Sequence, residues 1–276
     1  MGGIPADVLG KPTWRNATVD LELAGRVVLV TGGSDGLGRA LCDRLVAEGA
    51  SVGLCARDRD RLSTTATALT ESGGDVLAEV ADVTRPEDLS RFVGAALERW
   101  GRIDGLVNNA GRSAAKPVLT SDDADWDSDL QLKLLAAVRL SRLCLPSLQV
   151  AGGAIVNVLA IGAKTPSAGS TPSSVSRAAG MALTKALSRE VGSRGVRVNA
   201  VLIGLVRSGQ WERIAQSQGL HLEDLYGSMA ADAGVPLGRV GRAEEFADVV
   251  TFLLSPRSSY VTGTALNVDG GLCTTV

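Results

Sequence analysis

The stretch TGGSDGLG, Thr31–Gly38, constrains the fold of this 276-residue chain more than any other. It follows Arg26–Thr31 (RVVLVT), a short apolar, β-branched run that is typical of a strand buried on both faces. It leads into GLGRALCDRLVAEGA, whose apolar residues recur with a helical period. Glycines let the backbone turn sharply and approach a ligand, and a helix N-terminus attracts a pyrophosphate. In this strand–turn–helix context the glycine cluster predicts a dinucleotide-binding turn rather than a purely structural one.

The rest of the chain continues to alternate short apolar strands with helices. Six more strands are expected within residues 51–55, 75–83, 103–111, 154–160, 196–204 and 265–271. Further helices are expected at about residues 58–73, 86–100, 128–148, 172–193 and 243–255. The alternation predicts an α/β fold, a single doubly wound domain whose parallel seven-stranded sheet carries helices on both faces. Residues 1–22 are predicted to form an N-terminal arm and 23–276 the domain, with 208–240 irregular or weakly helical.

The composition excludes several classes of protein. A formal net charge of −2 and a pI near 5.6 leave no basic face for nucleic acid. No run of 18 or more apolar residues and no signal sequence is found, so we expect no membrane association and a cytoplasmic location. The four cysteines are widely spaced and His221 is the only histidine, so we expect neither a disulfide framework nor a metal site.

Several motifs together make the chain resemble the short-chain dehydrogenase/reductase family. They are the glycine spacing Gly32, Gly36, Gly38, the acid Asp82 after the third strand, NNAG at Asn108–Gly111, VRVNAV, VPLGRVGRAEEFADVVTFLLS and YVTGTALNVDGG. The resemblance covers about residues 23–271 and implies a Rossmann-type domain that binds a nicotinamide dinucleotide. It also implies a homodimer or homotetramer paired through helices 128–148 and 172–193, or a hetero-oligomer with an active family member.

Sixteen residues are candidates for binding the cofactor, most of them by the resemblance. They are Gly32, Ser34, Asp35, Gly36, Leu37, Gly38, Arg57, Asp82, Val83, Asn109, Ala110, Gly111, Arg177, Gly204, Val206 and Ser208. The resemblance implies that Asp82 and Val83 hold the adenine and that Asn109–Gly111 line the adenosine ribose. A substrate lid is implied over residues 208–240.

The end of the second strand, Cys55-Ala56-Arg57, bears on which cofactor is bound. An acid here would accept hydrogen bonds from the ribose 2′-OH of NAD, but position 56 is alanine. Arg57 instead offers a planar cation that suits a 2′-phosphate, unless it is simply a solvated surface arginine. Asp35 argues the other way, because NADP-preferring relatives often carry a basic residue at that position. On balance NADP(H) is favoured over NAD(H).

The positions that hold the family's catalytic residues differ in this chain. The tyrosine and lysine positions correspond to Ser173 and Arg177, the serine position to Ala160 and the asparagine position to Lys133. A serine hydroxyl is a far weaker acid than a phenol, arginine does not give up its proton, and alanine offers no hydrogen bond to an oxyanion. The resemblance therefore implies a divergent member in which the usual carbonyl reduction is very slow. The catalytic residues are left unknown.

Three functions remain open at this stage. The favoured one is an oxidoreductase acting on an unknown carbonyl or alcohol, with Lys133 or a lid residue such as Tyr226 as an unusual proton source. The second is a catalytically silent subunit that binds the cofactor or only a partner, and the third is a lyase or isomerase. Lys133 could point inward or be a solvated helix lysine. Thr171 is expected to cap the following helix, with Pro172 as its first residue.

Overall fold

A computed structural model describes residues 19–276 as a parallel sheet of seven strands. The strands are β1 (Val27–Thr31), β2 (Ser51–Ala56), β3 (Val76–Val80), β4 (Gly105–Asn108), β5 (Ala154–Ala160), β6 (Arg197–Ile203) and β7 (Ala265–Val268). Their order is β3-β2-β1-β4-β5-β6-β7, and all six pairings are parallel. The seven-stranded parallel sheet predicted from the sequence is confirmed.

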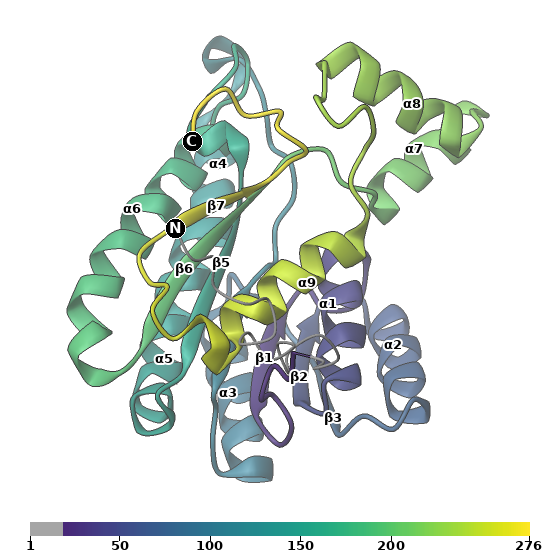
Figure 1. The fold of residues 1–276 in the computed structure, drawn as a ribbon. Helices are drawn as coiled ribbons and strands as arrows, with labels where there is room; N and C mark the ends of the chain where they lie inside the picture. Colours follow the sequence, from purple (N-terminus) through teal and green to yellow (C-terminus); the bar gives the residue numbers. More distant parts are fainter. Residues whose placement is uncertain (1–18) are drawn as a thin grey trace, which may run out of the picture.

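Helices cover both faces of this sheet (Figure 1). They are α1 (Gly36–Ala47), α2 (Arg59–Glu71), α3 (Pro86–Trp100), α4 (Asp123–Leu130), α5 (Ala136–Ala151), α6 (Ser173–Val191), α7 (Gly209–Gln218), α8 (Leu222–Ala233) and α9 (Ala243–Leu254). Helices α1, α2 and α9 pack on one face, and α3, α5 and α6 on the other. The doubly wound architecture follows because each parallel strand needs a crossover to reach the next.

Each face of the sheet has its own apolar core. Phe246 of α9 is fully buried against one face and Phe92 of α3 against the other. All five residues of β1 are buried, as expected for a central strand rich in valine and leucine. Full burial of one such side chain stabilises a fold by roughly 1.5–3 kcal/mol, so the two layers fix the sheet firmly.

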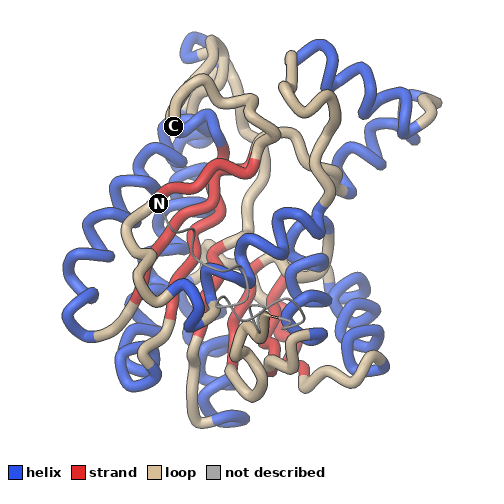
Figure 2. Tube along the Cα trace, in the orientation of Figure 1, coloured by secondary structure: helices blue, strands red, loops and turns tan. Residues whose placement is uncertain are grey.

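The strand order reverses at β1, which lies between β2 and β4. Parallel α/β sheets bind ligands in the crevice beyond the carboxyl ends of the strands at such a switch point. The loops that follow β1, β4, β5 and β6 all leave from that edge (Figure 2). The fold therefore brings together segments that lie more than a hundred residues apart in the sequence.

Two predicted helical regions differ from the structure. The helix expected at 128–148 begins at Asp123, because Asp122 and Asp125 form a reciprocal capping box, and it passes through a π-helical turn, η4 (Gln131–Leu135). The region 208–240, expected to be irregular or weakly helical, contains the two regular helices α7 and α8. Each of these helices ends at a glycine in the left-handed conformation, a stop signal that the sequence carried.

The start of α6 was also predicted wrongly. The helix begins at Ser173, Pro172 occupies the N-cap position, and no side chain caps the end. The Thr171 hydroxyl instead donates to the carbonyl oxygen of Lys116 at 2.8 Å, and its own carbonyl accepts from the Lys116 amide. Thr171 thus ties the loop after β4 to the start of α6 rather than capping the helix.

The helical segment 123–151 is long and apolar enough, by length and composition alone, to span a membrane. Core helices of proteins outside membranes can be equally long and apolar. This segment packs against α3 and α6 and carries a buried ion pair between Asp129 and Lys133. It is therefore accounted for as one of the packed layers of the domain.

The described end of the predicted N-terminal arm contacts the segment after α9. The carbonyl oxygen of Leu21 accepts from Ser255 Oγ at 2.6 Å, and Glu22 pairs with Arg257 at 2.9 Å. The rest of the arm, residues 1–18, lies outside the described residues.

Candidate active site

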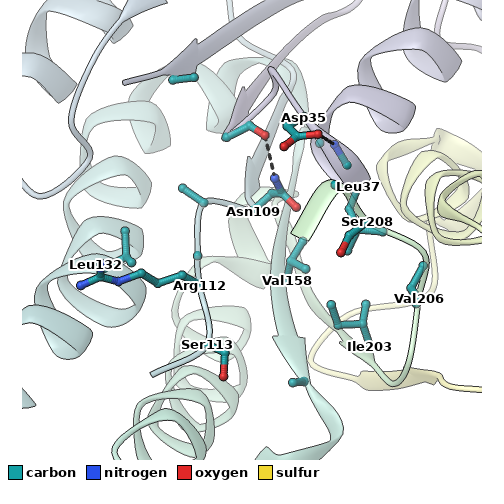
Figure 3. Close-up of a pocket in the computed structure, with 18 of the residues that line it drawn as sticks. Asp35, Leu37, Asn109, Arg112, Ser113, Leu132, Val158, Ile203, Val206 and Ser208 are labelled. Carbon is teal, nitrogen blue, oxygen red and sulfur yellow. Dashed lines mark hydrogen bonds between the residues drawn. The ribbon is translucent and has the colours of Figure 1, made fainter. Parts of the chain in front are cut away.

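A cavity of about 760 Å³ lies at the carboxyl edge of the sheet. All sixteen residues predicted to bind a cofactor line it, together with Ala160 and Ser173. Figure 3 shows Asp35, Asn109, Val206 and Ser208 converging on this cavity from the loops after β1, β4 and β6. The structure therefore brings the predicted binding residues into one site.

The glycine turn forms one wall of the cavity. Asp35 caps helix α1, its side chain accepting from the amide of Gly36 at 2.8 Å. Asn109 holds the turn by donating to the carbonyl oxygens of Thr31 and Gly32 at 2.8 and 3.3 Å. The result is a helix N-terminus and its free amides opening onto the cavity, the usual setting for a bound phosphate.

Gly38 is required for this close packing. A Cβ there would lie 2.6 Å from Asn109 Nδ2 and would collide with the carbonyl of Gly32. A larger residue would push the turn away from Asn109 and move the amides at the start of α1.

Two cations and an acid form the end of the cavity nearest β2. Arg57 is exposed and makes no hydrogen bond or ion pair with another residue of the described part of the chain, 19–276. Arg61, which the sequence reasoning missed, lies in the first turn of α2 and pairs with Asp35 at 3.0 Å and with Asp58 at 3.2 Å. The sequence could have indicated Arg61, because it lies only four residues after Arg57 and therefore close to the end of β2.

Asp82 completes this end of the cavity. Burial opposes its ionisation, but hydrogen bonds from the Thr84 amide and hydroxyl, at 2.9 and 2.7 Å, hold the pKa of Asp82 below its usual range. The positive charges of Arg57 and Arg85 act in the same direction as these hydrogen bonds. Asp82 is therefore a fixed anion at neutral pH, able to accept hydrogen bonds from a ligand.

These features fit a dinucleotide. The cavity is walled by glycines where a ligand backbone would pass, by a helix N-terminus, and by a cation at the far end. Free backbone amides and arginine side chains commonly bind phosphate groups, and an acceptor such as Asp82 can accept hydrogen bonds from an adenosine.

Ala160 at the end of β5, and Ser173 and Arg177 on α6, line the opposite end. Arg177 Nη1 donates to the carbonyl oxygen of Val158 at 3.2 Å, and Nη2 lies 3.5 Å from where a Cβ on Gly111 would be. Burial lowers the pKa of Arg177, against the opposing charge of Asp129, but arginine remains a cation in proteins. The guanidinium is thus a fixed, half-buried charge facing the cavity.

Lys133 points inward, which settles the question that the sequence left open. Its side chain is 3% exposed and lies in the π-helical turn η4. Its ammonium pairs with Asp129 at 2.5 Å and donates to Ser173 Oγ at 2.7 Å. Lys133 does not line the cavity directly, because Ser173 stands between them.

The environment of the Lys133 ammonium makes its proton easier to lose. The pKa of Lys133 is lowered to about 8, mainly by burial and also by the charges of Arg177 and Arg112, whereas the hydrogen bond and charge of Asp129 oppose the change. The group is therefore charged at neutral pH yet close to its titration point, the condition that suits an acid–base catalyst.

Asp129 is a residue of the site that the sequence reasoning missed. It is buried, and its second carboxylate oxygen accepts from the Ser176 hydroxyl at 2.6 Å. It thereby joins α4 to α6 while its first oxygen holds Lys133. The spacing of four residues between Asp129 and Lys133 was the only sequence signal for this pair.

Most of the candidate lid residues lie away from the reactive end. Tyr226 is buried under the guanidinium of Arg207, at 4.8 Å from its ring centroid, and packs in a small core of the lid. Arg207 also makes a two-pronged ion pair with Glu223, both contacts at 2.7 Å. Trp211 is the aromatic residue of the lid that does line the cavity.

Residues 32–273 match the model of a protein family described as enoyl-(acyl carrier protein) reductase. The chain belongs to the short-chain dehydrogenase/reductase family. A similar relative in this family is the granaticin polyketide synthase putative ketoacyl reductase 1 of Streptomyces violaceoruber, 36% identical over 253 residues. The matched region covers 89% of this chain and 92% of that protein.

Two solved structures of family members are similar to this one. The short chain oxidoreductase of Pseudomonas aeruginosa PAO1, solved with NADPH and described as containing an atypical catalytic center, is 36% identical with a TM-score of 0.86. The match covers 91% of this chain and 98% of that one. L-sorbose reductase of Gluconobacter frateurii, solved with NADPH and L-sorbose, is 33% identical with a TM-score of 0.89, covering 94% and 100%.

Proposed function

We propose that this protein is an NADP(H)-dependent oxidoreductase acting on a carbonyl or alcohol substrate. The observation that carries the proposal is the single cavity, which joins the glycine turn at one end to Ser173 and Arg177 at the other. NADPH, when bound, supplies a hydride to a carbonyl carbon. The chain's own residues must bind and orient both molecules and supply a proton.

The residues of the glycine turn would hold the cofactor's phosphates through backbone amides at the start of α1. Asp82 would accept hydrogen bonds from the adenine end, and Asn109–Gly111 would line the adenosine ribose. Arg177 would hold hydroxyls of the second ribose, since its cation lies in the cavity against Gly111.

Preference for NADP(H) is supported by the cations at the end of β2. Arg57 and Arg61 both line the cavity, so a 2′-phosphate would find two guanidinium groups there. Asp35 argued against this preference in the sequence, but its carboxylate already accepts from Arg61 at 3.0 Å and caps α1. Two similar structures in the family, described above, contain NADPH.

The test is a screen for turnover. The purified protein would be mixed with NADPH or NADH and a panel of β-ketoacyl thioesters, ketoses and diketones, following the absorbance of the reduced nicotinamide. We expect NADPH to be consumed with at least one carbonyl compound and NADH to be used far less well.

Other outcomes would support the two alternatives instead. NADPH that binds but is never consumed would indicate a catalytically silent subunit. Conversion of a substrate without any change in the nicotinamide would indicate a lyase or isomerase.

A further inference from the structure

We propose that Lys133 and Ser173 form the proton-transfer pair of this active site, with Asp129 and Ser176 as positioning residues. This inference rests on the proposed function and goes beyond it by naming the proton source. Ser173 lines the cavity, and Lys133 lies directly behind it with its Nζ 2.7 Å from the serine Oγ. The structure thus places a buried ammonium one hydrogen bond away from the space that a substrate would occupy.

The hydrogen bonds of Ser173 direct its own proton into the cavity. A serine hydroxyl can accept two hydrogen bonds and donate one. Ser173 Oγ accepts from Lys133 Nζ at 2.7 Å and from the backbone amide of Ala114 at 3.0 Å. Both acceptor sites are therefore filled from behind, and the remaining O–H is the group available to a carbonyl oxygen.

Lys133 is held in place by a network that spans two helices. Asp129, one turn earlier in the chain, contacts its ammonium at 2.5 Å and accepts from Ser176 Oγ at 2.6 Å. Ser176 lies one turn after Ser173 on α6, so both ends of the network are fixed to the same helix. The π-helical turn η4 lies between α4 and α5 and packs against α6, and π-turns of this kind are frequent at functional sites.

Three charged groups face the Lys133 ammonium. Asp129 of α4 favours the charged form, whereas Arg177 of α6 and Arg112 of the loop after β4 disfavour it, as burial does. The balance leaves Lys133 protonated at neutral pH but ready to lose its proton. Arg177 cannot take this role, because a guanidinium does not deprotonate.

The proposed step adds one hydride and one proton to the carbonyl group. The carbonyl carbon gains the hydride supplied by NADPH, the carbon–oxygen π bond breaks, and the oxygen takes the proton of Ser173 Oγ. Ser173 recovers a proton from the Lys133 ammonium, and neutral Lys133 is then reprotonated by solvent. Reduction by this route requires protonated Lys133, so the rate should fall as the pH rises through about 8.

The first experiment needs no substrate. The chain has five lysines, so selective ¹³C labelling of lysine gives five Cε signals whose pH titration is followed by NMR. We expect one signal, assigned by its loss in Lys133→Met, to titrate near pH 8 and to shift in Ser173→Ala. A Lys133 signal that titrates at the ordinary lysine value of 10.5, and does not respond to Ser173→Ala, would overturn the proposal.

The second experiment measures turnover with an acetoacetyl thioester, or with whichever carbonyl the screen finds. We expect Lys133→Met and Ser173→Ala each to lower kcat about 10²–10³-fold, while NADPH affinity stays within about twofold. Lys133→Arg, which keeps the charge but holds its proton, should be as slow as Lys133→Met, and Ser173→Thr should recover activity. Lys185→Met, an exposed lysine on the outer part of α6, is the matched control.

Asp129 has its own signature as a positioning residue. Asp129→Asn should move the high-pH limb of the rate profile to lower pH, because Asp129 raises the pKa of Lys133. If Lys133→Met does not fold, the double variant Asp129→Asn/Lys133→Met is used in its place, because it removes both buried charges together. Unchanged turnover in either Lys133 variant would overturn the proposal. So would a wild type that reduces no carbonyl while Lys133 still titrates near pH 8, since the pair would then be structural.

Discussion

The two ends of the cavity are built in different ways. The end beside β1 and β2 relies on backbone amides, on glycines, and on exposed arginines in the loop after β2 and the first turn of α2. The end beside α6 relies on buried side chains from two helices, joined by the contacts of Lys133 with Asp129 and Ser173. The first arrangement suits binding of a charged ligand at low cost in stability. The second keeps an ionisable group out of water, and burial therefore lowers the pKa of Lys133, whereas at the first end hydrogen bonds from Thr84 hold the pKa of Asp82 below its usual range.

The largest effect is expected from the glycine turn. Gly38→Ala adds a Cβ against the carbonyl of Gly32 and 2.6 Å from Asn109 Nδ2, so the turn must move. We expect NADPH affinity to fall by about 100-fold or more, measured by nicotinamide fluorescence. Gly94→Ala, on α3 with open space around it, is the control and should bind NADPH normally. Normal binding by Gly38→Ala would break the assignment of this end as the phosphate site.

The next prediction uses the pH dependence of stability at the other end. Lys133 has a pKa of about 8 when folded and 10.5 when unfolded, so the unfolded state binds more protons between these values. The contribution of Lys133 to the free energy of unfolding should therefore rise as pH rises through this window, by about 3 kcal/mol in total. Urea melts of the wild type against Asp129→Asn/Lys133→Met measure it. A difference between the two that does not vary with pH would show that Lys133 is not perturbed.

Arg57→Met tests whether Arg57 sets the preference for NADPH over NADH. Loss of a charge-assisted contact to a 2′-phosphate costs about 1.5–2 kcal/mol, which is about 10–30-fold in the Kd of NADPH. The Kd of NADH should change far less, because NADH has no 2′-phosphate to pair with the Arg57 guanidinium. Arg59→Met is the control, since Arg59 is exposed nearby but lies outside the cavity. Equal weakening of both cofactors would contradict the assignment.

The smallest effect is expected in the lid. The ion pair of Arg207 with Glu223 is exposed on both sides, and such pairs contribute about 0.2–1 kcal/mol. Glu223→Gln should therefore change KM for the substrate by no more than about fivefold and leave kcat nearly unchanged, in steady-state assays. Asp224→Asn removes a neighbouring, more exposed acid and should have no effect. A large loss of kcat in Glu223→Gln would mean that the lid takes part in the reaction.

The same contrast explains what the sequence could predict. The seven strands and the glycine turn follow from local patterns of apolar residues and glycines, and the structure agrees with them. The residues predicted at the binding end line the cavity because they lie in the loops that follow strands or in the first turn of α1. Arg61 was missed because its role depends on how the first turn of α2 faces the end of β2.

The reactive end could not be predicted in the same way. The direction of the Lys133 side chain depends on the π-helical turn η4, which has no clear sequence signal. The pairing of Asp129 with Ser176 joins residues 47 positions apart, and no local pattern connects them. The expected cap at Thr171 failed for a similar reason, because Lys116, far away in the chain, takes its hydroxyl.

The most direct test of the account is a fluorescence titration of the wild-type protein with NADPH and, separately, with NADH. The account predicts micromolar binding of NADPH and binding of NADH that is weaker by about tenfold or more. Absence of binding by either cofactor would contradict it, because the cavity would then have the shape of a dinucleotide site without its function.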